Sequence, residues 1–187
     1  MTPGLGLALG LRLSGESVND ATLAHMYGDK SLSGEFQAAL DLPHAFRASA
    51  LIGYRRSGGN QIDAQGQLAD SSSWIRYLPV AGLIGLHTDL GRVDLGVGLG
   101  PAAVSFAEQV GLGPVETSRG WKWGALVEGS ARVHLGELQA TDSAFSVEVS
   151  GGYRALMRRH GEVCGREEVC GFDLGAVRVG LGVMVGL

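Results

Sequence analysis

The sequence predicts an all-β protein, an eight-stranded antiparallel up-and-down barrel that spans a membrane. The first observation is alternation: from Trp121 to Leu135 one parity is apolar or small, while the other carries Lys122, Glu128 and Arg132. Successive side chains of a strand point to opposite faces, so such a strand separates two environments. The second observation is that about eight stretches share this pattern. The third is that long and short connections alternate between them, as in membrane barrels.

Length and composition limit the classes of protein that the chain can be. Its 187 residues suit one domain, and 45% are hydrophobic. Mean hydropathy is only +0.14. No uncharged apolar run reaches the ~18 residues of a spanning helix, so a membrane protein of this composition must cross with strands. A net charge of −4 with only two lysines, Lys30 and Lys122, excludes a nucleic-acid-binding surface.

The first three strands are expected at residues 4–13, 32–41 and 45–55. In the first, leucines alternate with glycine, alanine and arginine. In the other two, apolar residues alternate mainly with serine, glutamate, glutamine and arginine. Residues 14–31 are expected to form a polar loop. Pro43 marks a tight turn, since proline is excluded from a central ladder.

The next three strands are expected at residues 73–87, 92–105 and 121–135. The fourth strand is apolar on both parities and is interrupted by Pro79, and we expect its even-numbered residues from position 78 to face outward. The fifth strand alternates valine and leucine with glycine. Polar loops are expected at residues 56–72 and 106–120.

The last two strands are expected at residues 145–158 and 177–187, after a connection at residues 136–143. Both alternate valine and other apolar residues with glycine, serine or charged residues. Residues 159–171 form the fourth long loop. An even strand count with alternating connections puts both termini on the side of the short turns.

The glycine-rich, charged parity is expected to face inward. Glycine suits the narrow interior of an eight-stranded barrel, whereas a soluble barrel with an apolar interior would carry lysine and threonine outside. Aromatic residues of the apolar parity lie near strand ends, at a spacing that fits the ~25 Å between the aromatic girdles of a membrane barrel. The predicted girdle comprises Phe46, Tyr54, Trp74, Trp121, Trp123, Phe145 and Tyr153.

Residues 74–106 carry a family resemblance. The segment Arg76-Tyr77-Leu78-Pro79-Val80, followed by Gly96-Val97-Gly98-Leu99-Gly100-Pro101, resembles the second and third hairpins of the small OmpA/OmpX-like outer-membrane β-barrel family. The resemblance implies insertion in the outer membrane of a Gram-negative bacterium, with lipid and lipopolysaccharide as surroundings. One departure is the last residue, Leu187, where the family usually ends in an aromatic residue. If the protein is exported, we expect the chain to be the mature form with a start Met added.

The inward charges are expected to form a network of ion pairs, because buried charges are tolerated when they are paired. When each turn is placed at the centre of its connection, Asp41 is predicted to lie opposite its partner Arg47 and Arg132 opposite its partner Glu148, with Glu128 one diagonal step from Arg154. A network that blocks the interior is favoured over a narrow pore, because an eight-stranded barrel only just holds its own side chains. The predicted network comprises Arg12, Glu35, Asp41, Arg47, Asp94, Glu128, Arg132, Glu148, Arg154 and Arg178.

Cys164 and Cys170 lie close together in a polar stretch, which suits a disulfide in an oxidising compartment. A zinc site that also uses His160 and Glu162 is the less favoured alternative. No other metal and no cofactor is expected.

The leading functional hypothesis is a membrane anchor that presents its four long loops to the outside or to a partner protein, since binding residues concentrate on loops. A transport protein for small or hydrophobic solutes is the second hypothesis, with Pro79 and Pro101 as possible interruptions of the wall. Catalysis is not expected. His25 and His160 lie in outer loops without a neighbouring serine in a recognisable pattern, which argues against an enzyme that modifies lipid A.

Overall fold

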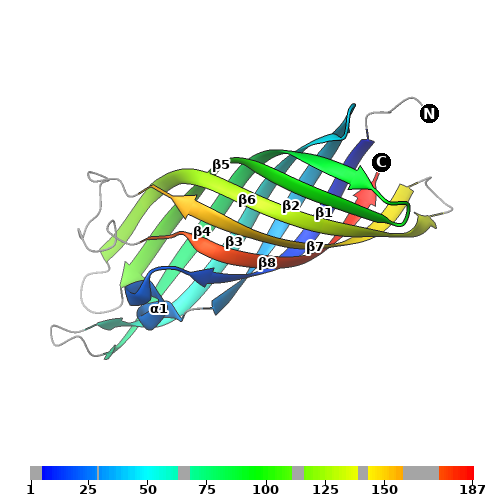
Figure 1. Ribbon diagram of the computed structural model, residues 1–187. Coiled ribbons are helices and arrows are strands. Elements are labelled where there is room, and N and C mark those ends of the chain that lie inside the picture. The colour runs from blue at the N-terminus through cyan, green and yellow to red at the C-terminus, as the bar shows by residue number, and fades with distance from the viewer. Residues whose placement is uncertain (1–5, 29, 63–67, 111–115, 139–142, 158–172) are drawn as a thin grey trace.

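The predicted fold is confirmed: eight antiparallel strands form a closed barrel in the order β1 to β8, with β1 paired to β8. Figure 1 shows the tilted strands wrapped around one axis. The computed structural model describes residues 6–28, 30–62, 68–110, 116–138, 143–157 and 173–187. The strands are β1 (Gly6–Val18), β2 (Lys30–Leu42), β3 (Phe46–Ile62), β4 (Leu68–Asp89), β5 (Val93–Val110), β6 (Glu116–Leu138), β7 (Ser143–Leu156) and β8 (Ala176–Gly186).

The apolar parity forms the outer wall. Leu11 is 68% exposed, whereas its neighbour Arg12 is 3% exposed. On β4, Leu78, Ile84 and Leu86 face outward, as the even parity predicted, and odd-numbered Leu83 is buried. A wall of leucine and valine around a charged interior suits a hydrocarbon environment and excludes a soluble barrel with an apolar interior.

Glycine on the inward parity makes room for large side chains. A Cβ at Gly180 would lie 2.6 Å from Cδ of Arg12, and one at Gly10 would lie 2.1 Å from Sδ of Met184. Both separations are far below van der Waals contact. Any larger residue at Gly180 would displace Arg12 from the centre of the barrel.

The end of the barrel away from the termini differs from the sequence-based expectation. Two predicted loops, residues 56–72 and 106–120, are largely strand where the structure describes them, and the predicted loop at residues 14–31 contains the end of β1, a short helix and the start of β2. The hairpins β3–β4 and β5–β6 extend well beyond the apolar stretches that predicted them (Figure 1). Beyond the bilayer an outward side chain need not be apolar, so a strand continues there without the alternation on which the prediction rested. The fourth predicted loop, residues 159–171, lies outside the described residues.

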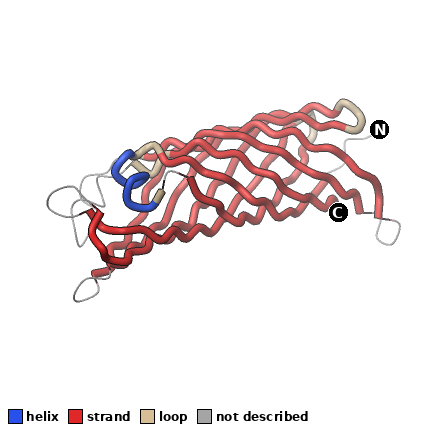
Figure 2. The backbone as a smooth tube through the Cα atoms, turned by 90° about the horizontal axis from the view of Figure 1, so that it is seen from below, coloured by secondary structure: helices blue, strands red, loops and turns tan. Residues whose placement is uncertain are grey.

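The segment between β1 and β2 holds a helix that the sequence did not predict, α1 (Ala21–Tyr27). Asp20 caps it, because its carboxylate accepts hydrogen bonds from the backbone N–H groups of Thr22 and Leu23. Figure 2 shows α1 at the barrel end opposite the two termini. Within the described residues, no helix combines the length and the apolar character that a membrane crossing requires.

Candidate functional site

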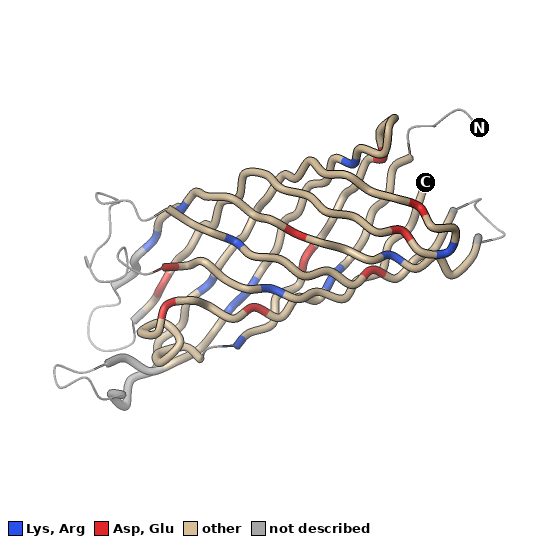
Figure 3. Tube along the Cα trace, in the orientation of Figure 1, with Lys and Arg blue, Asp and Glu red and all other residues tan. Residues whose placement is uncertain are grey.

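The barrel interior contains a nearly balanced set of buried charges. The structure describes seven buried cations, namely Arg12, Arg47, Arg55, Lys122, Arg132, Arg154 and Arg178. It also describes six buried carboxylates, namely Glu16, Glu35, Asp94, Glu108, Glu128 and Glu148, with the half-buried Asp41 as a seventh. Figure 3 shows both signs distributed along the barrel. With Asp41 included, the described inward charges balance, so they add no net charge to the membrane-spanning part of the molecule.

Arg12 on β1 lies at the centre of this network. Its Nε donates to Oε2 of Glu35 at 2.8 Å, and its two Nη atoms donate to the carboxylate of Glu128 at 2.8 and 3.1 Å. Nη1 also donates to Oγ of Ser150 at 2.7 Å and lies 3.8 Å from Oε1 of Glu148. One guanidinium group thereby connects β1 to β2, β6 and β7 across the interior. Bidentate pairing of this kind fixes geometry as well as charge.

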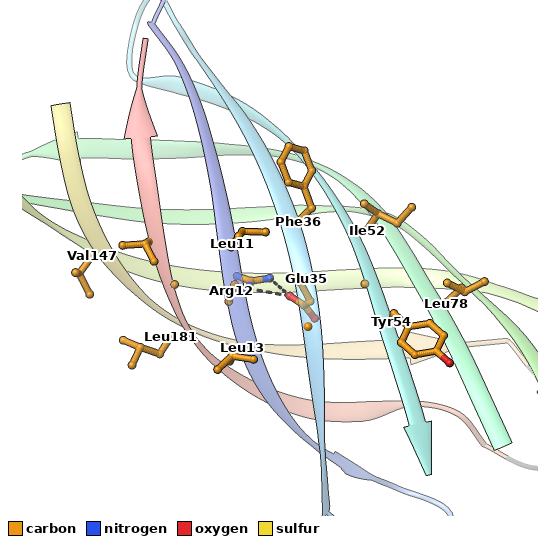
Figure 4. A pocket seen from close by; sticks show the side chains of 14 residues that line it. Leu11, Arg12, Leu13, Glu35, Phe36, Ile52, Tyr54, Leu78, Val147 and Leu181 are labelled. Carbon is orange, nitrogen blue, oxygen red and sulfur yellow. Dashed lines mark hydrogen bonds and ion pairs between the residues drawn. The ribbon is translucent and has the colours of Figure 1, made fainter. Parts of the chain in front are cut away.

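Arg178 on β8 completes the central group. It donates to Glu35, and its Nε lies 3.8 Å from Oε2 of Glu128. Arg12 and Arg178 therefore share the same two carboxylates. Figure 4 shows Arg12 and Glu35 joined behind the wall, with the neighbouring leucines on the other face of their strands.

Glu16 is a member of the network that sequence reasoning missed, because residues 14–31 were assigned to a loop. Its two carboxylate oxygens accept hydrogen bonds from Nη1 and Nη2 of Arg154, both at 3.1 Å, and Oε2 lies 3.6 Å from Arg55. The predicted diagonal placement of Glu128 and Arg154 is confirmed by the register, in which Glu128 lies opposite Gly152, but each side chain pairs with a different partner. Arg154 forms an ion pair with Glu16, and Glu128 forms one with Arg12. Side chains that reach across the interior meet partners that the register of neighbouring strands does not reveal.

The two contacts predicted from the turns are present. Arg132 on β6 lies opposite Glu148 on β7 and donates to its Oε2 from Nη2 at 2.9 Å. Arg47 on β3 lies opposite Asp41 on β2 and donates to its Oδ1 from Nε at 2.5 Å. Both pairs join neighbouring strands, which is why spacing alone was enough to predict them.

Arg47 also belongs to a cluster near the end of the barrel where the termini lie. It donates to both carboxylate oxygens of Asp94 on β5, at 3.1 and 2.8 Å. Nδ1 of His87, half-buried on β4, lies 3.1 Å from Oδ2 of Asp94. Asp94 thus connects the predicted Asp41 and Arg47 pair to two further strands.

At the opposite end, α1 packs into the mouth of the barrel. Leu23 and Tyr27 of α1 are buried in a cluster with inward-facing residues of β4 and β5 and with Leu174. Phe106, predicted to lie in a loop, is one of these and is 2% exposed. The cluster residues on the strands are Ile75, Tyr77, Val104 and Phe106.

The Tyr27 hydroxyl donates to the carboxylate of Glu108 on β5. Burial, together with this hydrogen bond, raises the pKa of Tyr27 above its ordinary value. Close packing against β3 holds the same end of the helix: a Cβ at Gly59 would lie 1.9 Å from the carbonyl oxygen of Met26. The helix is therefore fixed to the wall by both a polar and a steric contact.

Two cavities in the described interior are very small. One, of about 30 Å³, is lined in part by Gln37, Glu128 and Glu148, and the other, of about 10 Å³, lies beside Arg154 and Arg178. Oε1 of Gln37 and Oε1 of Glu148 are buried without a hydrogen-bond partner among the described residues. The larger cavity has the polarity and the size for a single water molecule.

The outer wall carries a much larger, shallow hollow of about 870 Å³. It lies over Gly34 of β2, which has no side chain to fill the space between Leu13 on β1 and Tyr54 on β3. Figure 4 shows the apolar side chains around it, to which Phe36, Ile52 and Leu78 also belong. A hollow on this face opens toward hydrocarbon.

The predicted girdle residues all lie on the outward parity. Phe46, Tyr54, Trp121, Trp123 and Tyr153 are exposed, and Phe145 is half-exposed. The rings of Trp121 and Trp123 are stacked with centroids 6.1 Å apart. Trp74 differs from the others because it is flanked by cations: Cζ of Arg56 lies 4.9 Å and Cζ of Arg76 lies 6.0 Å from its ring.

The remaining predicted site lies outside the described residues. Cys164, Cys170 and the alternative zinc ligands His160 and Glu162 belong to residues 158–172, so the disulfide stays a prediction. In the part of the chain that the structure describes, no group of three or more histidine, cysteine or acidic side chains is arranged to hold a metal ion.

No protein-family model and no curated protein matches the sequence. Solved structures do match. Ail, the attachment invasion locus protein of Yersinia pestis, in complex with the heparin analogue sucrose octasulfate, gives a TM-score of 0.61 at 11% identity over 98% of this chain and 99% of that chain. A major outer membrane protein from Thermus thermophilus gives 0.58 at 13% identity over 96% and 99%.

At these identities the likeness concerns the fold. It supports a small outer-membrane barrel and does not single out the OmpA/OmpX-like family. The apolar outer wall and the buried charges of this chain agree with the same setting. The chain is therefore a closed eight-stranded barrel of the kind that spans bacterial outer membranes.

Proposed function

We propose that the protein is an outer-membrane anchor whose interior is blocked and whose extended rim is presented to the outside. The main observation in support is the ion-pair network around Arg12, which joins carboxylates of β2, β6 and β7 at the centre of the barrel. The packing of α1 in the mouth supports the proposal from the other end. The long β3–β4 and β5–β6 hairpins and α1 offer surfaces for a partner protein.

The energetics of the network favour a permanent block. A hydrated ion that passes the centre must separate Arg12 from its carboxylates, and breaking a buried ion pair costs about 3–5 kcal/mol. Several pairs lie on the path, including those made by Glu16 and Asp94. The balance of signs also leaves no net charge that would select ions of one sign.

Planar-bilayer recording tests this proposal. We expect the full-length protein, inserted and folded, to show no stable unitary current. The variant Arg12→Ser/Glu128→Ser removes one charge of each sign and a large volume, so we expect it to raise the current while it keeps the interior balanced. A stable open level in the unaltered protein contradicts the proposal.

Transport of hydrophobic solutes is the second candidate, favoured by interruptions in the strand pairing. Pairing of β3 with β4 skips from Ile52 and Val80 to Arg55 and Tyr77, around Pro79. Pairing of β4 with β5 skips from Ala81 and Ala102 to Ile84 and Leu99, around Pro101. A lateral path through either gap predicts saturable uptake of a hydrophobic fluorophore into vesicles that hold the protein, and uptake equal to that of empty vesicles excludes it.

We also propose that the protein is not an enzyme. His25 is exposed on α1, and its neighbours along the helix are apolar or small. Mass spectrometry of lipid A from cells with and without the protein provides the test, and a mass change that depends on the protein contradicts this part of the proposal.

A further inference from the structure

Three arginines form one row on the outer face of the barrel. Arg56 on β3 lies directly opposite Arg76 on β4, Arg76 lies opposite Ala107 on β5, and Ala107 lies opposite Arg119 on β6. All three arginines are exposed. Directly opposed side chains have Cβ atoms about 5 Å apart, and like charges at such positions repel. We call Arg56, Arg76 and Arg119 the basic row.

No ion pair relieves this repulsion among the described residues. The guanidinium groups of Arg56 and Arg76 both lie near the ring of Trp74, which is itself uncharged. The described outward neighbours of the row on these strands include Gly58 and Gln109, and none of them is acidic. A further cation, Lys30, is exposed on β2. Within the described part of the chain, the row therefore lacks an anion.

The row lies at the outer edge of the apolar band. The next row toward the termini contains Leu78, Ser105 and Trp121, which are paired in sequence across β4, β5 and β6. Trp121 belongs to the aromatic residues that mark the membrane interface. One step of two residues on a tilted strand adds roughly 5 Å, so the basic row lies at the level of the lipid headgroups.

The hollow on the outer wall begins directly beneath the row. Tyr54 and Leu78 line it. They lie two residues closer to the middle of the membrane than Arg56 and Arg76 on the same strands. The hollow continues over Gly34 between apolar side chains of β1 and β3, such as Leu13 and Ile52. Cations above and an apolar groove below match the two parts of a phosphorylated lipid.

We propose that this face binds one anionic lipid, with phosphate groups on the basic row and an acyl chain in the hollow over Gly34. Arginine suits this role because its planar donors match phosphate oxygens in pairs. The inference rests on the membrane location in the proposed function and is independent of whether the interior is blocked.

Native mass spectrometry of the full chain in neutral detergent tests the headgroup part. The probes are diphosphoryl lipid A, the same lipid after dephosphorylation, and inorganic phosphate. We expect one diphosphoryl lipid to bind roughly tenfold more tightly than the dephosphorylated form. The variant Arg56→Gln/Arg76→Gln loses that preference, whereas the control Arg92→Gln, at an exposed turn at the other end of the barrel, keeps it.

The acyl-chain part has its own variant. A Cβ at Gly34 meets nothing within 4 Å, and the same holds for Gly82 on β4, which also faces outward and does not line the hollow. We expect Gly34→Trp to weaken binding of diphosphoryl lipid A several-fold by filling the hollow, and Gly82→Trp to leave it unchanged. Heat-modifiable mobility on gels reports whether each variant is folded.

Two results overturn the inference. One is equal affinity of the unaltered protein and Arg56→Gln/Arg76→Gln for the diphosphoryl lipid. The other is binding of inorganic phosphate as tight as that of the lipid, which makes the row a site for soluble anions. The proposed function is tested separately, by insertion into a phosphatidylcholine bilayer without a stable current. Failure of the lipid-binding inference can therefore be distinguished from failure of the proposed function.

Discussion

The guanidinium group of Arg12 lies close to carboxylates on three strands, and the space that it occupies depends on a glycine. Arg12 contacts Glu35, Glu128 and Glu148, while Gly180 on β8 leaves the room that its side chain needs. The sequence predicted that Arg12 faces inward from parity alone. Glu35 lies directly opposite it on the neighbouring strand, but the contact with Glu128 was beyond prediction, because Glu128 is 116 residues away and the contact depends on how the closed barrel brings far strands together.

Removal of this group tests its contribution. We expect Arg12→Met to lower the free energy of unfolding by about 3–5 kcal/mol, because it leaves buried carboxylates without their counterion. Urea unfolding in lipid vesicles, followed by tryptophan fluorescence, gives the value. Arg92→Met removes the same charge at an exposed turn and is expected to stay within about 0.5 kcal/mol. A loss below about 1 kcal/mol for Arg12→Met would mean that water reaches the carboxylates.

Among the secondary-structure elements, α1 is the one that the sequence did not predict. Seven residues are too few for a helical period to stand out, and the cap at Asp20 was the one local signal available. The strands were found because alternation runs along their membrane-facing length, whereas the polar extensions of β3–β6 carry no such signal. Glu16 was missed for the same reason, since it lies on the extension of β1.

A pair of neighbouring glycines on β3 tests how α1 is held. A side chain at Gly59 meets Met26 and Tyr27 of the helix, whereas one at Gly58 faces outward and meets nothing closer than 4.0 Å. We expect Gly59→Leu to expel α1, so that its amide hydrogens exchange rapidly while those of β4 and β5 stay protected. Hydrogen exchange with mass spectrometry provides the measurement. Equal protection of α1 in Gly59→Leu and Gly58→Leu would show that the helix is not seated on this strand.

For the whole molecule, the blocked interior is built in two separate layers. The apolar cluster of α1 lies at the mouth, and the ion pairs of Arg12 and Arg178 lie behind it. Alternation, turn spacing and the balance of signs were sufficient to predict a barrel with a charged interior. The first layer was not predicted, because it depends on the helix.

This layering predicts the effect of removing α1. Ser17 and Lys30 are paired at the ends of β1 and β2, so a two-residue Asn-Gly turn that joins Ser17 directly to Lys30 replaces the intervening residues, which include the helix. We expect this variant to fold and still to show no stable unitary current in a planar bilayer. Combined with Arg12→Ser/Glu128→Ser, the same deletion is expected to give a larger current than either change alone. An open level after the deletion alone would mean that α1 is the main barrier.

The pairing of β1 with β8 couples closure of the barrel to neutralisation of its buried charges. Arg12 lies on the first strand and Arg178 on the last, and both neutralise Glu35 of β2 and Glu128 of β6. In a sheet that is not yet closed, Glu35 lacks Arg178 and Glu128 lacks Arg12, so each acid would face the lipid with one of its two cations missing. Completion of the cylinder and neutralisation of its contents are thus a single event, and a half-finished barrel is poorly suited to remain in hydrocarbon.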